Sequence, residues 1–226
     1  MAKQKIAVLH TSFVFVSVEP MINDLLAELV PDAEIIHFVD SDVLATVVRE
    51  NRISDASAQR MVHLAEAAEL AGADLIFSAC SSLGPALDIA AQHVGTPIVK
   101  IDEAMTARAA ADADHIGVLA TVPTTLGPTS DLIAKHARIL KRQVTITERL
   151  SRGAFDILMA GDRARHDDMV VAEAEALAGE VDLIVLAQAS MSRLADRISE
   201  ATGLPVLASP RMGISQLAER AHALEG

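Results

Sequence analysis

Aromatic residues are scarce in this sequence. The 226 residues include five Phe but no Trp and no Tyr, and the formal net charge is −12. Base-stacking surfaces need aromatic faces, and a strongly acidic chain is repelled by nucleic acid and by anionic membranes. We therefore expect neither nucleic acid nor a membrane as a partner. A small anionic ligand is compatible with this charge, because N–H and hydroxyl donors in a local pocket can hold it.

Cysteine and long apolar runs are also lacking. Cys80 is the only cysteine, which excludes an intrachain disulfide and a multi-cysteine metal cage and is typical of a reducing cytoplasm. No segment approaches 18 uninterrupted apolar residues, the length of a membrane span. The N-terminal apolar run ends at His10, Thr11 and Ser12, which indicates a first strand rather than a signal peptide. We predict a soluble, cytoplasmic protein.

Several familiar site motifs are absent as well. The sequence has no Gly-x-Gly-x-x-Gly after its first strand, no Walker-type lysine loop, no His-Glu-x-x-His and no Cys-x-x-Cys. It also lacks the Gly-x-Ser-x-Gly elbow of serine hydrolases. We expect no cofactor and no metal.

Short apolar runs alternate with longer helical patterns, which is typical of an α/β fold built from βαβ units. Hydrophobic residues, mainly Ala, Val, Ile and Leu, make up 51% of the chain, as expected for buried parallel strands covered by helices. The expected strands are 5–11, 33–39, 73–79, 96–101, 115–121, 143–149, 181–187 and 204–209. The expected helices are 20–30, 55–71, 83–94, 102–112, 126–140, 166–178, 190–202 and 211–224.

The chain contains an internal repeat. The stretch "ADLIFSACSSLGPALDIAAQHVGTPIV" (73–99) is followed 108 positions later by "VDLIVLAQASMSRLADRISEATGLPVL" (181–207), so that Asp74 aligns with Asp182 and Pro97 with Pro205. Unrelated βαβ units share such strands and turns, but an offset preserved through strand, helix and turn favours a duplication.

We therefore predict two pseudo-symmetric lobes, residues 1–112 and 113–226, each with a four-stranded, mostly parallel sheet. The final helix could pack back on the first lobe. Ligands of parallel α/β proteins bind beyond the carboxyl ends of the strands. Four small, hydroxyl-rich clusters follow equivalent strands: "HTS" (10–12), "CSS" (80–82), "TVPTT" (121–125) and "QASM" (188–191). Lobes that face each other would bring these clusters into one cleft.

Cys80 lies between a predicted strand and a predicted helix. A helix N-terminus stabilises a thiolate, and Ser81 and Ser82 could add hydrogen bonds. The alternative is a buried, inert cysteine, which is the common fate of a lone Cys beside an apolar strand.

A family resemblance rests on the two-lobed pattern and on three segments, "ACSS" (79–82), "GVLATVPTT" (117–125) and "VLAQASM" (185–191). Through these features the sequence resembles the aspartate/glutamate racemase superfamily over essentially the whole chain. Its members include amino-acid, hydantoin and allantoin racemases, maleate isomerase and arylmalonate decarboxylase. The resemblance implies two thiols, one in each lobe, that exchange a proton on either face of the carbon α to a carboxylate. It also implies that neither pyridoxal phosphate nor a metal takes part, and that hydroxyls and N–H groups stabilise an enediolate.

Carried over by position, the resemblance makes Cys80 the first-lobe thiol and places Gln188 where the second thiol would be. Substrate-binding roles fall on Thr11, Ser12, Ser81, Ser82, Thr121, Thr124, Thr125, Ala189 and Ser190. His10 stands where glutamate racemases have an acidic residue, and an imidazole there could shuttle protons or simply bond a neighbouring carbonyl.

Gln188 is the main departure, because an amide cannot exchange a proton at neutral pH. The sequence therefore favours a cofactor-independent racemase or isomerase of a small carboxylic acid, with Cys80 as general acid and base. Two alternatives stay open: a malonate-type decarboxylase with a single cysteine, and a non-catalytic carboxylate-binding protein. We also expect a homo-oligomer.

Three further features have a weaker functional reading. The segment "GDRARHDD" (161–168) could meet a second carboxylate or be a solvated helix start. Asp74 and Asp182 begin strands and are interpreted as structural. Lys100 and Asp102 end a strand, and the sequence does not assign them a role.

Overall fold

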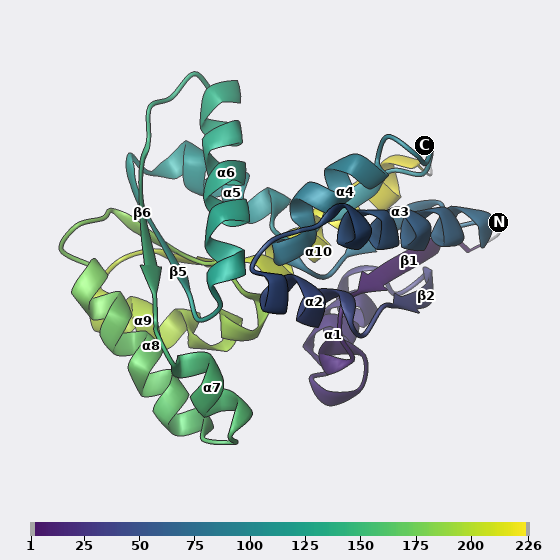
Figure 1. Ribbon diagram of the computed structural model, residues 1–226. Helices are drawn as coiled ribbons and strands as arrows, with labels where there is room; N and C mark the ends of the chain where they lie inside the picture. Colours follow the sequence, from purple (N-terminus) through teal and green to yellow (C-terminus); the bar gives the residue numbers. More distant parts are fainter. Residues whose placement is uncertain (1–2, 225–226) are drawn as a thin grey trace. The chain divides into compact units, whose positions relative to one another are not determined.

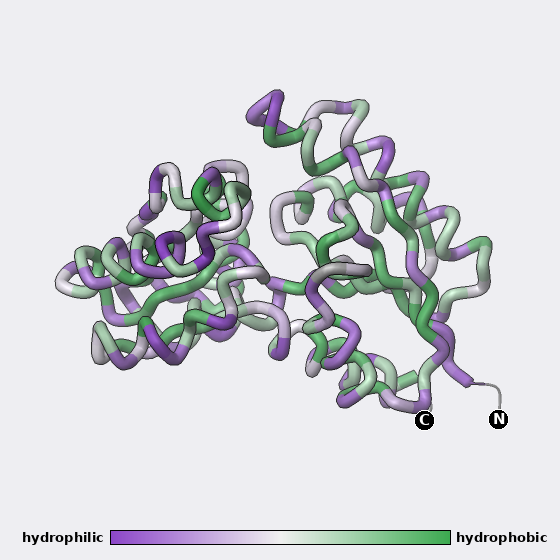
Figure 2. The backbone as a smooth tube through the Cα atoms, turned by 90° about the horizontal axis from the view of Figure 1, so that it is seen from below, coloured by the Kyte–Doolittle hydropathy of each residue, from purple (hydrophilic) through white to green (hydrophobic). Residues whose placement is uncertain are grey.

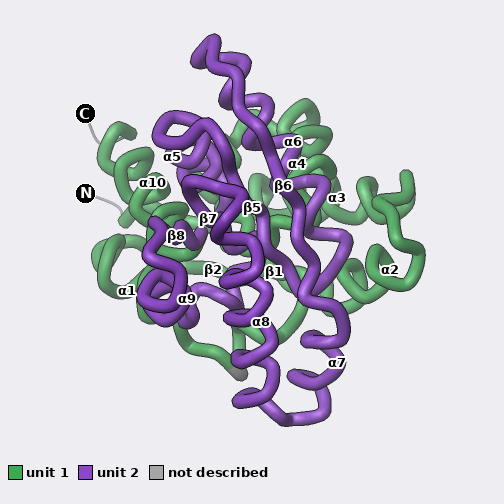
Figure 3. The backbone as a smooth tube through the Cα atoms, turned by 90° about the vertical axis from the view of Figure 1, so that its left-hand side faces the viewer, with its two compact units in different colours: residues 1–101, 210–226 green, residues 102–209 purple. Residues whose placement is uncertain are grey.

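The computed structural model describes residues 3–224 and contains two four-stranded, all-parallel sheets flanked by helices (Figure 1). The predicted fold class is confirmed. The chain forms two compact units, Met1–Ile101 with Pro210–Gly226, and Asp102–Ser209 (Figure 3). The predicted lobe boundary lies after residue 112, whereas the helix Glu103–Asp112 groups with the second unit because it packs against the helix Pro123–Ile139.

The first unit has the strand order β2-β1-β3-β4. Its elements are β1 (Lys5–His10), the π-helix η1 (Val14–Val18), α1 (Met21–Leu29), β2 (Glu34–Val39), α2 (Val43–Glu50), α3 (Asp55–Leu70), β3 (Leu75–Ser78), the 3-10 turn η2 (Ser81–Leu83), α4 (Gly84–Ala90), β4 (Ile98–Lys100) and α10 (Ser209–Leu224).

The second unit repeats this order as β6-β5-β7-β8. It comprises α5 (Glu103–Asp112), β5 (His115–Ala120), α6 (Pro123–Ile139), β6 (Thr145–Leu150), α7 (Ala154–Met159), α8 (Arg163–Leu177), β7 (Leu183–Leu186), the 3-10 turn η3 (Ala189–Leu194), α9 (Ala195–Thr202) and β8 (Val206–Ala208).

The two central strands of each sheet are buried on both faces. Hydrophobic residues are concentrated along the strands, whereas hydrophilic residues recur along the helices (Figure 2). In the first unit Ala7 and Leu9 of β1 pack with α2, α3 and α4, including fully buried Met61. Side chains alternate between the faces of a strand, so His10 lies on the opposite face. This alternation decides which helices can surround each candidate site residue.

The C-terminal helix α10 packs within the first unit. Arg211 makes two hydrogen bonds to Glu28 of α1, at 2.6 and 2.9 Å. Gly213 lies so close to the backbone of Ile101 that an added Cβ would stand 2.2 Å from the carbonyl oxygen. A glycine is therefore required for this approach.

The second unit has an equally close approach inside its core. A Cβ on Gly117 of β5 would lie 2.6 Å from Leu177 Cδ2 of α8. Leu177 belongs to the core cluster that covers one face of this sheet with α7, α8 and α9. Because Gly117 has no side chain, α8 can pack closely against the sheet.

Asp74 and Asp182 occupy equivalent positions in the two sheets. Asp74 Oδ2 accepts a hydrogen bond from Lys5 N at 2.8 Å, and Asp182 Oδ2 accepts one from His115 N at 3.0 Å. Each carboxylate thus holds the first residue of the neighbouring strand, at the amino end of the sheet.

The secondary structure departs from the sequence prediction in a few places. α2, α7 and η1 were not expected: α2 is rich in β-branched valines, which favour strands, and α7 has only six residues. α6 begins at Pro123, so Thr124 and Thr125 lie in its first turn rather than in a loop. None of the helices formed by residues 3–224 combines the length and the apolar character needed to cross a bilayer.

Candidate functional site

The first unit gathers two of the predicted clusters at the carboxyl edge of its sheet. β1 and β3 are neighbours, with Leu9 in register with Ser78. Ala79 N donates to Leu9 O at 3.1 Å, so the segments that begin at His10 and at Cys80 leave adjacent strand ends. Parallel strands end at the same edge, which is where ligands bind in this fold class.

Cys80 is half-buried and packs against the apolar cluster formed by α2, α3 and α4. Its backbone is extended, with φ −136° and ψ 113°, and it precedes the 3-10 turn η2 rather than an α-helix. Ser81 and Ser82 in that turn are buried. The helix predicted over 83–94 begins at Gly84, directly after η2, and ends at Ala90.

The side chains that follow β1 differ in burial. Thr11 is buried, whereas Ser12 is half-buried and its Oγ accepts a long hydrogen bond of 3.4 Å from Val14 N. Phe13 and Val14, next in the chain, are exposed. The segment after β1 therefore carries two hydroxyl groups followed by two exposed apolar side chains.

His10 is paired with His37, a residue for which the sequence gave no functional signal. Nε2 of His10 lies 3.0 Å from Nδ1 of His37, and the ring centroids are 5.1 Å apart. Burial, with a smaller contribution from His37, lowers the pKa of His10 to about 4. The ring is therefore neutral at pH 7 and cannot act there as a protonated acid. Burial also lowers the pKa of His37.

In the second unit, the side chain of Gln188 is held by the segment that follows β5. Its Oε1 accepts hydrogen bonds from Thr121 N at 2.6 Å, Thr121 Oγ1 at 3.1 Å and Val122 N at 3.1 Å. The backbone of Gln188, at φ −116° and ψ 134°, is extended like that of Cys80. With Oε1 occupied, the amide can offer a substrate only the two N–H groups on Nε2.

The remaining candidates of the second unit lie in α6 and η3, the elements that follow Val122 and Gln188. Thr125 Oγ1 donates to Val122 O at 2.6 Å and so stabilises the start of α6. Thr124 Oγ1 is buried and has no hydrogen-bond partner among the described residues. Ala189 is buried and Ser190 half-buried, both in η3. Thr124 therefore supplies an uncommitted hydroxyl in the first turn of α6.

His166 and Asp167 of the segment 161–168 belong to a hydrogen-bond network within the second unit. His166 is buried, and its Nδ1 lies 2.7 Å from Asp167 Oδ1. Asp167 also accepts hydrogen bonds from Arg193 of η3. Burial alone would raise the pKa of Asp167, but the hydrogen bonds from Arg193 and His166 hold it below its ordinary value. This network ties η3, which follows Gln188, to the start of α8.

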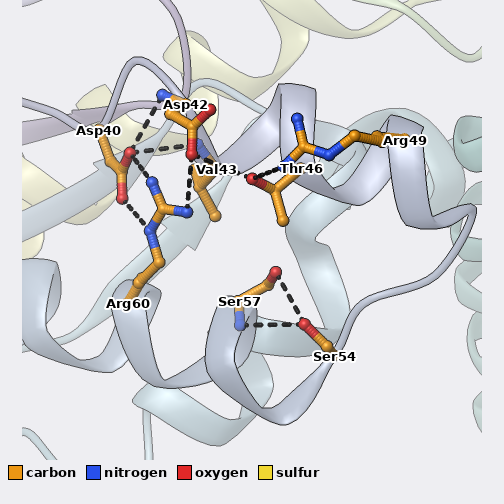
Figure 4. Close-up of polar contacts among 8 residues, drawn as sticks. All are labelled: Asp40, Asp42, Val43, Thr46, Arg49, Ser54, Ser57 and Arg60. Carbon is orange, nitrogen blue, oxygen red and sulfur yellow. Dashed lines mark hydrogen bonds and ion pairs between the residues drawn. The ribbon is translucent and has the colours of Figure 1, made fainter.

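A second polar network lies at the end of β2 (Figure 4). Arg60 of α3 donates to Asp40 through Nε at 2.6 Å and to Asp42 at 3.2 Å, while Asp40 also accepts from Val43 N at 3.1 Å. Val39, Asp40, Ser41, Arg60, His63 and Leu64 line a pocket of about 420 Å³ here. The guanidinium of Arg60 and the carboxylates of Asp40 and Asp42 are hydrogen-bonded to one another. We therefore interpret this network as a structural link between α3 and the start of α2.

Lys100 is also engaged within the first unit. It is buried at the end of β4 and donates from Nζ to Asp88 at 2.8 Å. Within the described part of the chain, no group of three or more His, Cys, Asp or Glu side chains is arranged to hold a metal ion.

The fold and the loop clusters together define a class of protein: two parallel α/β units, each with hydroxyl-bearing segments at the carboxyl edge of its sheet. The family model described as Asp/Glu/Hydantoin racemase matches residues 16–217. The chain belongs to this family, and membership supports racemase or isomerase activity. The sequence matches none of the curated proteins.

Solved structures of racemases share the fold. A glutamate racemase of Francisella tularensis, in complex with D-glutamate, gives a TM-score of 0.75 at 13% identity, covering 99% of this chain and 82% of that one. A glutamate racemase of Bacillus anthracis gives 0.77 at 16%, covering 98% and 82%. The allantoin racemase of Klebsiella pneumoniae gives 0.67 at 17%, covering 99% and 89%.

Proposed function

We propose that this protein is a cofactor-independent racemase or isomerase that moves a proton at the carbon α to a carboxylate of a small acid. Cys80 is the general acid and base. The observation that carries the proposal is the position of this single thiol at the carboxyl end of β3, next to the end of β1 and followed by the buried hydroxyls Ser81 and Ser82.

In the proposed reaction the Cys80 thiolate removes the α-proton and the electrons move onto the carboxylate as an enediolate. Hydroxyl and N–H donors stabilise that charge. The thiol then returns the proton to a neighbouring carbon, which completes an isomerisation. Racemisation instead requires a second group that protonates the α-carbon from the opposite face. Only the proton moves and no oxidant is needed, so the step balances without a further reactant.

Gln188 has a different role from a second thiol. Its Oε1 is held by Thr121 and Val122, which fixes the direction of the Nε2 amide. We propose that this amide donates to a substrate oxygen. The chemistry is then one-sided at Cys80, unless another group serves the opposite face.

The experiment is α-proton exchange in D₂O with a panel of amino acids, hydroxy acids and malonates, followed by NMR and mass spectrometry. We expect α-deuteration of at least one compound. Cys80→Ser and Cys80→Ala should lower the exchange rate by at least about 10²-fold, in the range attributed to general acid–base catalysis. Thermal unfolding of both variants controls for a loss of fold.

The outcomes separate the alternatives. An unchanged rate in a folded Cys80→Ser variant rules out the proposed mechanism. Stabilisation by a carboxylate without exchange of any compound points to a binding protein, and release of CO₂ from a malonate points to the lyase reaction.

A further inference from the structure

The strand next to Cys80 ends in a buried lysine. In the parallel register of β3 and β4, Lys100 lies opposite Ser78, which comes two residues before Cys80. The side chain of Lys100 is 10% exposed, and its Nζ donates to Asp88 of α4 at 2.8 Å. Lysine is rarely buried unless it is paired. The carboxyl edge of the first sheet therefore holds a buried positive charge one strand away from the thiol.

Lys100 and Cys80 lie on the same face of the sheet. Cys80 packs against the apolar cluster of α2, α3 and α4, and so does Ile98, two residues before Lys100. Side chains two apart on a strand share a face. The contacts of Lys100 agree, because Asp88 belongs to α4 and a Cβ on Gly84, the first residue of α4, would lie 3.9 Å from Lys100 Cδ. The lysine stem thus packs against the start of the helix that follows Cys80 and η2.

The spacing of parallel strands sets how far apart the two residues are. Cys80 keeps an extended backbone beyond the end of β3. Neighbouring strands are about 4.8 Å apart and each residue rises about 3.3 Å, so the Cα atoms of Cys80 and Lys100 are separated by about 8 Å. Diagonal neighbours at this spacing are within reach of a long side chain.

Ser78 adds a polar group to the same place. It is 0% exposed, and its Oγ has no hydrogen-bond partner among the residues that the structure describes. Leu9 and Lys100 flank it in the register, which puts its side chain on the face of Cys80. A buried hydroxyl without a partner is destabilising. The thiol is therefore bordered by a polar patch within an otherwise apolar core.

From this geometry we infer that Lys100 is a positioning residue of the proposed reaction, whose ammonium group favours the thiolate form of Cys80. The inference rests on the proposed function, which needs a thiolate to remove the α-proton. A neighbouring positive charge stabilises a thiolate, and partly buried charges are screened little by salt. Asp88 opposes this effect, but its side chain is 55% exposed against 10% for Lys100, so solvent weakens the field of the carboxylate more than that of the ammonium.

A second charged network on this face lies on the other side of Cys80. Arg60 of α3 pairs with Asp40 and Asp42, which follow β2, and β1 separates β2 from β3. This network has two carboxylates and one guanidinium, so it would disfavour a thiolate. Of these two charged groups, Lys100 is the one that can favour it.

The test compares Lys100→Met with Asp88→Asn. Both variants break the ion pair between β4 and α4. Methionine keeps a long flexible stem without the charge, whereas asparagine keeps the ammonium and an oxygen acceptor for it. The measurement is the rate at which iodoacetamide alkylates the single cysteine as a function of pH, which reports its thiolate. Urea denaturation of both variants measures the structural cost of losing the pair.

We expect alkylation at pH 7 to be at least about threefold slower in Lys100→Met, with its midpoint at a higher pH. In Asp88→Asn it should be unchanged or faster, because the opposing carboxylate is gone. Lys100→Arg keeps the charge and should react like the native protein, and Lys100→Gln replaces Lys100→Met if that variant does not fold. Equal slowing in Lys100→Met and Asp88→Asn, or an unchanged rate in Lys100→Met, overturns the inference.

These readouts do not depend on turnover. With an active compound, the rise of proton exchange with pH should move to higher pH in Lys100→Met, while the rate at high pH, where the thiol ionises in any case, stays near that of the native protein. Loss of exchange in Cys80→Ser with an unaltered alkylation profile in Lys100→Met would keep the proposed function and reject the role of Lys100. Slower alkylation in a protein that exchanges no compound would keep the effect on the thiol and reject the proposed function.

Discussion

Gln188 Oε1 accepts a hydrogen bond from Thr121 N at 2.6 Å, which joins the end of β7 to the end of β5 inside the second unit. At the equivalent place in the first unit stands Cys80, whose side chain can supply no comparable acceptor. The position that the family resemblance assigns to a second thiol is thus used here to fix a loop. Substituting it should affect stability as well as turnover.

Removing this acceptor should destabilise the protein. In Gln188→Leu, the N–H groups of Thr121 and Val122 lose their partner while buried. An unsatisfied buried donor costs about 1–3 kcal/mol, so we expect the free energy of unfolding to fall by roughly 2 kcal/mol. Gln188→Glu keeps an oxygen acceptor and should lose less than about 1 kcal/mol. Urea denaturation of both variants checks this; equal losses would contradict the assignment.

The close approach of α10 to Ile101 gives a second test. Gly213→Ala places a Cβ 2.2 Å from a backbone oxygen that cannot rotate away. Overpacking of this kind costs typically 1–3 kcal/mol and at times more, so we expect a loss of about 3 kcal/mol. Gly179→Ala is the control, since an added Cβ there meets no atom within 4 Å; it should be neutral or stabilise by up to about 1 kcal/mol. A Gly213→Ala variant as stable as Gly179→Ala would show that α10 does not pack in this way.

The pKa of His10 predicts a dependence of stability on pH. It falls from an ordinary 6.5 to about 4 in the folded protein, so between these values the unfolded chain binds more protons. The contribution of the neutral ring is complete above pH 6.5 and is lost progressively as the pH falls toward 4. Between pH 7 and pH 5 this group should cost roughly 2 kcal/mol of unfolding free energy.

The check is urea denaturation at pH 7 and pH 5. His10→Gln should lose about 2 kcal/mol less than the native protein over this interval. His93→Gln, which alters an exposed histidine, should follow the native protein. If His10→Gln also follows it, the ring does not titrate as stated.

The sequence was sufficient for the fold. Each of the eight predicted strands matches a strand of the structure within a few residues. The central strands of each sheet are buried on both faces and therefore stand out as short apolar runs. The repeat also located Asp74 and Asp182 at the starts of equivalent strands, and their hydrogen bonds to Lys5 and His115 agree with a structural role. The duplication itself stays a prediction, although the two sheets share one strand order.

Parts of the chain with weak local signals were missed. α2 has valines that favour strands, and it is helical because Val43 and Val47 pack into the core of the first unit. The segment 161–168 could be interpreted either as a ligand contact or as a solvated helix start. The contact of Asp167 with Arg193, which is distant in sequence, favours the structural interpretation.

The candidate site shows the same division between sequence and tertiary structure. By itself the sequence determined which residues follow the strands, and it singled out Cys80 and Gln188 because composition and a repeat are properties of the chain alone. Only the folded structure showed that Gln188 Oε1 is committed to Thr121 and Val122, and that His10 meets His37. The physical reason is that strand register and side-chain direction set these contacts, and both depend on how distant segments pack.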